Sequence, residues 1–170
     1  KTVLPGVGSF RDGMKNLEEL NLVEVLNNEV LNKKKIFLGI CLGMQLIGSK
    51  SHELSETTGL GWVESEIVKF DFPDAEIELK IPHVGWNNVH LAKGSPLFEQ
   101  IENNSDFYFV HSFHFETDPK YVIGNSQYGI DFISSIQKEN IFACQFHPEK
   151  SQNDGLKLLK NFANMELEQC

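Results

Sequence analysis

Residues 36–47 read IFLGICLGMQLI, and this stretch decides the fold. Residues 36–40 form a short continuous apolar run, which is typical of a strand buried on both faces of a sheet. Residues 44–47 then favour a helix. A turn of the form glycine–X–nucleophile–X–glycine between such a strand and a helix is a nucleophile elbow. The stretch therefore predicts an α/β protein with Cys41 at the end of a buried strand.

The elbow would give Cys41 the surroundings of a reactive thiol. Gly39 and Gly43 keep the strained turn free of side chains. The sulfur would lie at a helix N-terminus, where partial positive charge lowers a thiol pKa and favours the thiolate. The amide of Leu42 could point at a developing oxyanion. A buried, inert cysteine beside a glycine turn is the alternative, so a catalytic partner is needed to decide.

Residues 145–151, QFHPEKS, provide that partner after the strand-like run at 141–144. Pro148 disfavours a helical conformation of His147, and in an extended chain residues two apart point to the same side. Glu149 can therefore hold the imidazole of His147, which would take the proton of Cys41. Alone, the segment is an ordinary surface loop. Together with an elbow on another strand, it predicts catalysis.

Zinc binding is a second interpretation of the same residue types. His111, His114, His147 and Cys41 could be imagined as ligands. Neither the CxxC nor the HExxH spacing of zinc sites is present, so we expect no metal.

Composition narrows the class of protein further. The 170 residues carry a net charge of −9, which argues against nucleic-acid and anionic-membrane surfaces, since both need basic patches. No apolar run approaches the length of a membrane span. Three cysteines without tight spacing do not form a disulfide framework, so we expect a cytoplasmic setting. The length fits a single domain, residues 1–170.

The rest of the chain alternates helix-like and strand-like segments, as an α/β protein does. Helical periodicity predicts one helix over about residues 12–32 and a closing helix over 155–168. Residues 107–110 resemble the other buried strands, and the more mixed region from 62 to 89 suggests exposed antiparallel strands.

Three further segments contain candidate site residues. Residues 5–10, PGVGSF, are a glycine turn that lacks the Gly-Lys-Ser/Thr ending of a phosphate loop and fits better as a second source of oxyanion amides. Trp86 lies in a Pro/Gly-containing segment, where an exposed interface residue and a buried one are equally compatible with composition. His111 follows a buried strand, and we expect a structural role for it.

Five segments together resemble the class I (triad) glutamine amidotransferases. They are residues 4–10, 39–45, 82–87, 108–112 and 145–151. The elbow and the His-Pro-Glu segment are specific to the class, whereas residues 4–10 and 82–87 point to its histidine-pathway branch. The resemblance implies a three-layer α/β, flavodoxin-like fold with a mostly parallel central sheet flanked by helices and a small antiparallel extension.

The resemblance also implies roles for residues. Cys41 would attack the amide of L-glutamine and form a glutamyl thioester, with His147 as acid and base and Glu149 orienting it. Ammonia would pass to a (β/α)8 cyclase subunit, the other half of a heterodimer, without metal or organic cofactor. The remaining roles are an oxyanion hole of Val7 (after a partner-driven rearrangement), Gly8 and Leu42, glutamine binding by Gln45, Glu53, Ser112 and Phe113, and a partner interface of His83, Gly85, Trp86 and Asn87.

The chain departs from the family pattern in three places. An N-terminal strand, helix and strand that family members carry are absent from it. Residues 48–52 and 61–66 also differ from the common pattern, which suggests paralogues that supply ammonia to a sugar amidotransferase of surface-glycan synthesis. The elbow alone would also permit a cysteine hydrolase of esters or thioesters.

Overall fold

The computed structural model describes residues 1–72 and 79–166. Expectations that fall on residues 73–78 and 167–170 lie outside these ranges. The elements in chain order are β1 (Thr2–Gly6), α1 (Phe10–Glu19), α2 (Leu22–Leu26), the π-helix η1 (Asn27–Asn32), β2 (Phe37–Cys41), α3 (Leu42–Leu46), β3 (Lys50–Ser51), β4 (Thr57–Thr58), β5 (Ser65–Lys69), β6 (His83–Leu91), η2 (Pro96–Phe98), β7 (Ser105–His111), β8 (Phe113–Thr117), η3 (Pro119–Tyr121), β9 (Val122–Tyr128), β10 (Ile130–Lys138), β11 (Ile141–Cys144), η4 (Pro148–Lys150) and α4 (Gln152–Asn164).

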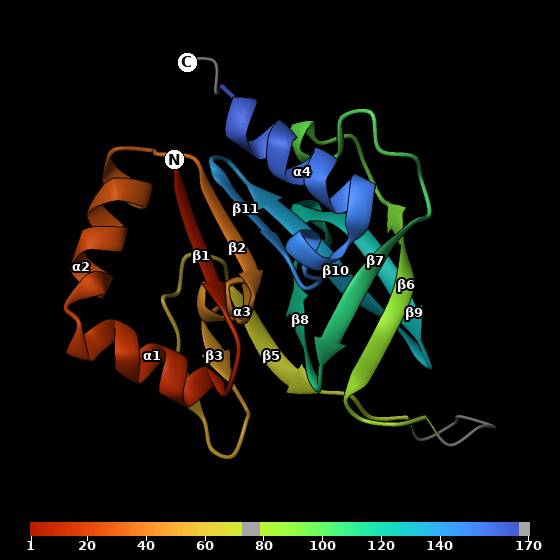
Figure 1. Ribbon diagram of the computed structural model, residues 1–170. Helices are drawn as coiled ribbons and strands as arrows, with labels where there is room; N and C mark the ends of the chain where they lie inside the picture. The colour runs from red at the N-terminus through yellow and green to blue at the C-terminus, as the bar shows by residue number, and fades with distance from the viewer. Residues whose placement is uncertain (73–78, 167–170) are drawn as a thin grey trace.

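The strands pair into one connected mixed sheet (Figure 1). Its main path runs β1-β2-β11-β10-β8-β5-β3-β4, and β6, β7 and β9 branch from it. The pairs β1/β2, β2/β11 and β3/β5 are parallel, and the other pairs are antiparallel. The α/β class is confirmed, although the antiparallel part is larger than the small extension that we expected. Parallel pairing is concentrated around the strand that ends at Cys41.

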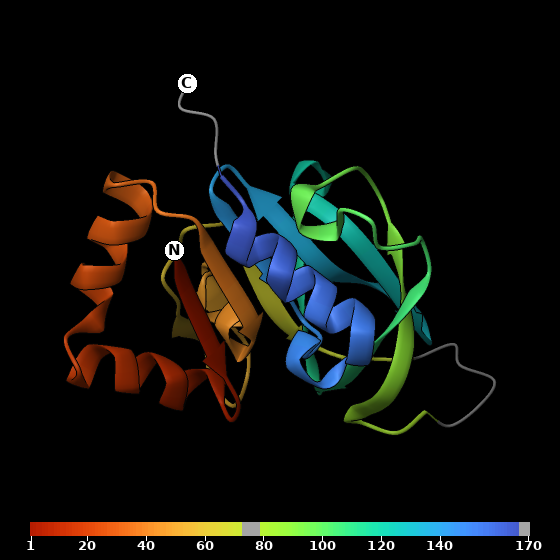
Figure 2. The same ribbon diagram turned by 45° about the horizontal axis from the view of Figure 1, so that its top comes forward.

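Alternating side chains on the central strands divide the core into two clusters. Phe37 and Ile141 lie in the cluster that contains residues of α1 and α3, whereas Leu38 and Phe142 lie in the cluster that contains residues of α4. Successive side chains of a strand point to opposite faces, so the sheet is covered on both sides. Figures 1 and 2 show α3 and α4 on opposite sides of β2 and β11. These are the three layers that the family resemblance implied.

The single helix predicted over residues 12–32 is wrong. Helix α1 begins after the cap Ser9, whose side chain accepts a hydrogen bond from the amide of Asp12, and it ends at Glu19. Asn21 then adopts a left-handed conformation with φ of 54°, which turns the chain before α2. Apolar residues continue at helical spacing on both sides of this residue, so periodicity alone does not reveal the break.

The exposed antiparallel strands expected between residues 62 and 89 are present in β6, which pairs antiparallel with β7 and exposes Val84 and Trp86, but β5 is less exposed than we expected. On β5, Ser65 and Ile67 are buried, and the strand pairs antiparallel with β8 and parallel with β3. Within the described ranges, no helix combines the length and the apolar character needed to cross a membrane.

Candidate active site

The elbow forms where the sequence predicted it. Strand β2 ends at Cys41, which has φ of 53° and ψ of −109°, and α3 begins at the next residue. A Cβ atom on Gly43 would lie 1.7 Å from the carbonyl oxygen of Leu4, and one on Gly39 would lie 2.7 Å from the carbonyl oxygen of Gly43. The turn therefore requires glycine on both sides of the cysteine, because backbone occupies the space of a side chain.

Cys41 lies almost entirely inside the protein. Its Sγ atom is 3.9 Å from the carbonyl oxygen of Val110 and 3.7 Å from Nε2 of Gln145. Burial raises the pKa of the Cys41 thiol to about 11, although hydrogen bonds from the Leu42 amide and the Gln145 side chain act to lower it. The predicted lowering of this pKa is therefore wrong, since desolvation outweighs the amide at the start of the five-residue helix α3.

His147 and Glu149 form the pair that the sequence predicted. The Nδ1 atom of His147 lies 2.7 Å from Oε1 of Glu149, which is half-exposed. His147 itself is 2% exposed, and its Nε2 atom has no hydrogen-bond partner among the residues that the structure describes. Strand β11 runs parallel to β2 with Cys144 beside Ile40. The residues that follow the two strands therefore lie at the same end of the sheet.

A cavity of about 300 Å³ opens beside Cys41. Most of the predicted site residues contribute to its wall, whereas His147 and Glu149 lie outside the wall, beyond the end of β11. The residues around it are Val7, Gly8, Cys41, Leu42, Gln45, Glu53, Pro82, Val110, His111, Ser112 and Phe113. The amides expected for an oxyanion and the side chains expected for glutamine thus surround the same space.

Glu53 connects two parts of this wall. Its Oε2 atom accepts a hydrogen bond of 2.6 Å from the amide of Phe10, at the start of α1 and directly after the glycine turn. Glu53 itself follows β3, in the loop that leads to β4. The carboxylate therefore links this loop to the segment that carries Val7 and Gly8.

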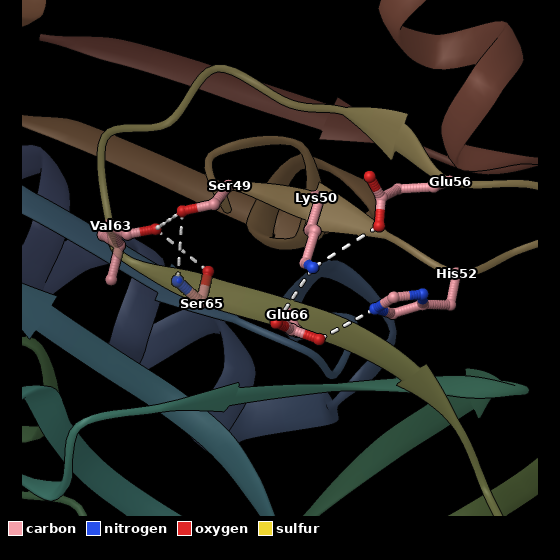
Figure 3. Close-up of polar contacts among 7 residues, drawn as sticks. All are labelled: Ser49, Lys50, His52, Glu56, Val63, Ser65 and Glu66. Carbon is pink, nitrogen blue, oxygen red and sulfur yellow. Dashed lines mark hydrogen bonds and ion pairs between the residues drawn. The ribbon is translucent and has the colours of Figure 1, made fainter.

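A surface ion network holds the strands around that loop (Figure 3). Nζ of Lys50 lies 3.4 Å from Glu56 and 3.2 Å from Glu66, and Nε2 of His52 lies 2.8 Å from Glu66. The hydrogen bond from His52 lowers the pKa of Glu66, and Lys50 acts in the same direction. Lys50 and His52 thus join the segment before Glu53 to β5, and Lys50 also ties that segment to Glu56, which follows Glu53.

The predicted partner-interface residues separate into exposed and buried members. Trp86 is 48% exposed on β6 and its ring lies across that of Tyr108 on β7. Val84 on the same strand is also exposed. His83, in contrast, is buried, with Nδ1 3.0 Å from Nε2 of His111, so it lies beneath this surface instead of forming it.

The second ring nitrogen of His111 also has a partner. Its Nδ1 atom donates to the carbonyl oxygen of Phe113 at 2.8 Å. His111 is thus the satisfied structural histidine that the sequence suggested. Within residues 1–72 and 79–166, no three His, Cys, Asp or Glu side chains are grouped to hold a metal ion.

Sequence reasoning did not single out Gln145. The residue is fully buried, accepts a hydrogen bond from Gln45 at 3.0 Å and donates toward the sulfur of Cys41. Its place in the chain, directly after the buried strand β11 and two residues before His147, was the available signal. The contact itself depends on the pairing of β11 with β2, which the sequence does not display.

Comparison with known proteins decides the family. Residues 2–165 match the family described as "Glutamine amidotransferase class-I". The chain belongs to the class-I glutamine amidotransferases. The match includes every site residue described above.

Individual relatives are similar over nearly the whole chain. The chain is 53% identical over 165 residues to "Imidazole glycerol phosphate synthase subunit HisH 1" of Campylobacter jejuni, which covers 97% of this chain and 81% of that protein. It is 46% identical over 165 residues to "Imidazole glycerol phosphate synthase subunit HisH" of Methanocaldococcus jannaschii, covering 97% and 80%.

Solved structures agree on the fold of this class-I amidotransferase. A crystal structure of a glutamine amidotransferase matches with a TM-score of 0.68 at 16% identity, over 95% of this chain and 78% of the other. A glutamine amidotransferase from Thermotoga maritima matches with a TM-score of 0.61 at 19% identity, over 95% and 59%. At these identities the likeness concerns the fold alone.

Proposed function

We propose that this protein is the glutaminase subunit of an imidazole glycerol phosphate synthase, which hydrolyses L-glutamine to glutamate and ammonia and passes the ammonia to a (β/α)8 cyclase subunit. The observation that carries the proposal is the elbow cysteine, Cys41, at one strand end beside a cavity, with the His147–Glu149 pair at the end of the neighbouring strand. Family membership and relatives named as subunits of this synthase support it.

The chemistry assigns one step to each member of the triad. Nε2 of His147 takes the thiol proton as Sγ of Cys41 attacks the side-chain carbonyl carbon of glutamine. The bond from that carbon to nitrogen then breaks, His147 returns the proton to the departing nitrogen, and ammonia leaves a glutamyl thioester. Water, deprotonated by His147, hydrolyses the thioester to glutamate and regenerates the thiol. Glu149 keeps the proton of the imidazole on Nδ1.

Backbone amides stabilise the oxyanion of both tetrahedral intermediates. Burial raises the pKa of the Cys41 thiol, and the Leu42 amide acts against this effect by a hydrogen bond to the sulfur. Val7 and Gly8 line the same cavity and supply the second donor. Gly8 has φ of 106°, a conformation that an L-residue with a side chain rarely adopts. Glycine therefore allows a peptide orientation at this position that other residues disfavour. A partner-driven rearrangement of the Val7 peptide completes the hole.

Gln45, Glu53, Ser112 and Phe113 hold the glutamine head group. The carboxylate of Glu53 is complementary to the α-ammonium group of an amino acid, and it lies in the wall of the cavity. The cyclase docks on the β6–β7 surface, where Trp86 and Val84 expose apolar area next to the end of β7. Aromatic residues of this kind are enriched in the energetically dominant parts of interfaces.

The test measures glutamate release from glutamine by the full chain, alone and with a cyclase subunit of this synthase. We expect strong stimulation by the cyclase and loss of activity in Cys41→Ala. If a sugar amidotransferase stimulates the reaction and the cyclase does not, the sugar amidotransferase is the partner and the proposed partner is wrong. A Cys41→Ala protein with an unchanged rate would refute the glutaminase mechanism itself.

A further inference from the structure

One backbone carbonyl fixes the orientation of a hydrogen-bonded chain that reaches Cys41. The carbonyl oxygen of Phe113 accepts from Nε2 of Gln45 at 3.1 Å and from Nδ1 of His111 at 2.8 Å. A carbonyl oxygen can only accept, so both neighbours must present an N–H group to it. This single constraint determines which atom of the Gln45 amide is nitrogen and which nitrogen of His111 carries hydrogen.

The inner branch of the chain ends on the sulfur. Gln45 uses one hydrogen of its amide for Phe113, and its second hydrogen points to Oε1 of Gln145 at 3.0 Å. The amide of Gln145 is therefore oriented with its nitrogen toward Cys41, and Nε2 donates to Sγ at 3.7 Å. Gln145 is fully buried and Gln45 is 8% exposed, so water does not compete for these groups.

The outer branch ends on β6. Since Nδ1 of His111 donates to Phe113, its Nε2 accepts from Nδ1 of His83 at 3.0 Å. The remaining nitrogen of His83 then accepts from Nδ2 of Asn87 at 3.4 Å. Burial lowers the pKa of both histidines, so both rings stay neutral and each is a donor on one side and an acceptor on the other. The two branches meet at Phe113 and hold its carbonyl in place.

We infer that Gln145 is a positioning residue for the nucleophile: its side-chain amide, oriented through Gln45 by the Phe113 carbonyl, stabilises the thiolate of Cys41. The inference rests on the proposed function in that Cys41 is the attacking group. Hydrogen bonds to a charged acceptor are stronger than those to a neutral one, so the contact favours the thiolate over the thiol. In a site where burial opposes ionisation, this donor offsets part of the cost of forming the nucleophile.

The test is the rate at which iodoacetamide alkylates Cys41 in the full chain at pH 8, followed by mass spectrometry of the Cys41 peptide. This reaction needs the thiolate but not glutamine, so its outcome is independent of whether the protein is a glutaminase. Gln145→Met retains the length of the side chain and removes the donor. We expect alkylation to slow by about tenfold, which corresponds to a rise of one unit in the thiol pKa.

A second substitution separates thiolate stabilisation from simple packing. Gln145→Glu keeps an oxygen that accepts from Gln45, but it has no donor for the sulfur and adds negative charge when ionised. We expect alkylation to slow by at least the same factor as in Gln145→Met. The matched control is Gln127→Glu, the same change at an exposed position of β9, which should stay within about twofold of the wild-type rate.

The fold is monitored in the same experiment through Cys144, which is fully buried and should remain unlabelled in every variant. Unchanged or faster alkylation of Cys41 in both Gln145 variants, with Cys144 protected, would overturn the inference. If neither variant folds, the wild-type protein decides: the side-chain carboxamide carbon-13 signal of Gln145 should titrate together with the Cβ signal of Cys41. A chemical shift of Gln145 that does not change as Cys41 ionises would also overturn the inference.

Discussion

Nδ1 of His147 lies 2.7 Å from Oε1 of Glu149, while Nε2 of the same ring is buried without a hydrogen-bond partner in the described chain. A carboxylate oxygen accepts, so Nδ1 carries the hydrogen and the lone pair of the neutral ring is on Nε2. A buried acceptor left unpaired costs free energy, and such groups in native proteins are often functional. The unpaired Nε2 is thus the atom of His147 that can accept a proton.

Replacing Glu149 with glutamine should impair the glutaminase reaction without unfolding the protein. The amide retains the size of the side chain but no longer enforces the Nδ1–H tautomer of His147. We expect the rate of glutamate release, measured with the cyclase present, to fall by at least about 100-fold, by analogy with triads in which the acidic member becomes an amide. Glu102→Gln, at an exposed position, is the matched control and should retain the wild-type rate.

A methyl group at position 43 should prevent correct folding of the elbow. Its Cβ would lie 1.7 Å from the carbonyl oxygen of Leu4, so β1 or α3 has to move. We expect Gly43→Ala to lower the free energy of unfolding by more than about 3 kcal/mol, as overpacking against backbone does. Gly94→Ala is the control, because nothing lies within 4 Å of its Cβ position. Equal urea midpoints for the two variants would contradict this account.

Acid should destabilise the protein through the paired histidines. Burial lowers the pKa of His83 to about 4 and that of His111 to about 3, from 6.5. As pH falls below 6.5, the unfolded chain binds protons that the folded chain does not, so stability is fully present above this pH and is lost below it.

By pH 4 we expect the free energy of unfolding to have dropped by at least about 3 kcal/mol, as two or more units of pKa shift imply. Urea titrations at several pH values measure how steeply the free energy of unfolding falls with pH. His83→Phe should flatten this dependence, since one of the two groups no longer titrates. A variant with the wild-type slope would assign the acid sensitivity to other groups.

Alkali should destabilise the protein through Cys41. Burial raises the pKa of this thiol from 9.0 to about 11, so its contribution to stability is present below pH 9 and disappears as pH rises through 11. Over this range the wild-type protein should lose about 2 kcal/mol more than Cys41→Ser, whose hydroxyl does not titrate there. Cys144 titrates in both proteins and cancels in the comparison. Identical alkaline profiles would show that the thiol ionises equally well in the folded state.

Local sequence was sufficient for the elements that carry their own signals. The strand that ends at Cys41 and the strand before His147 are continuous apolar runs, and both appear as β2 and β11. The helix break was not predictable, because the left-handed Asn21 interrupts a pattern whose apolar spacing continues past it.

Most residues of the site could be predicted from the sequence, but their burial and their contacts with one another could not. The raised pKa of Cys41 depends on how completely the rest of the chain covers the sulfur, and no local pattern encodes that burial. The contact between His83 and His111 exists because β6 and β7 pair with these residues directly opposite, a register that two separate segments do not specify. The contact of Gln145 with Cys41 was not predictable for the same reason, since it depends on the pairing of β11 with β2.

The backbone of Cys41, with φ of 53° and ψ of −109°, sets a limit on how stable this protein can become. A non-glycine residue held in such a conformation costs about 1–3 kcal/mol, and the surrounding fold must absorb that cost. Glycine would relieve it, yet glycine has no sulfur. Selection for thermal stability alone should therefore favour Cys41→Gly. The most stable sequence for this turn is one that has lost the nucleophile.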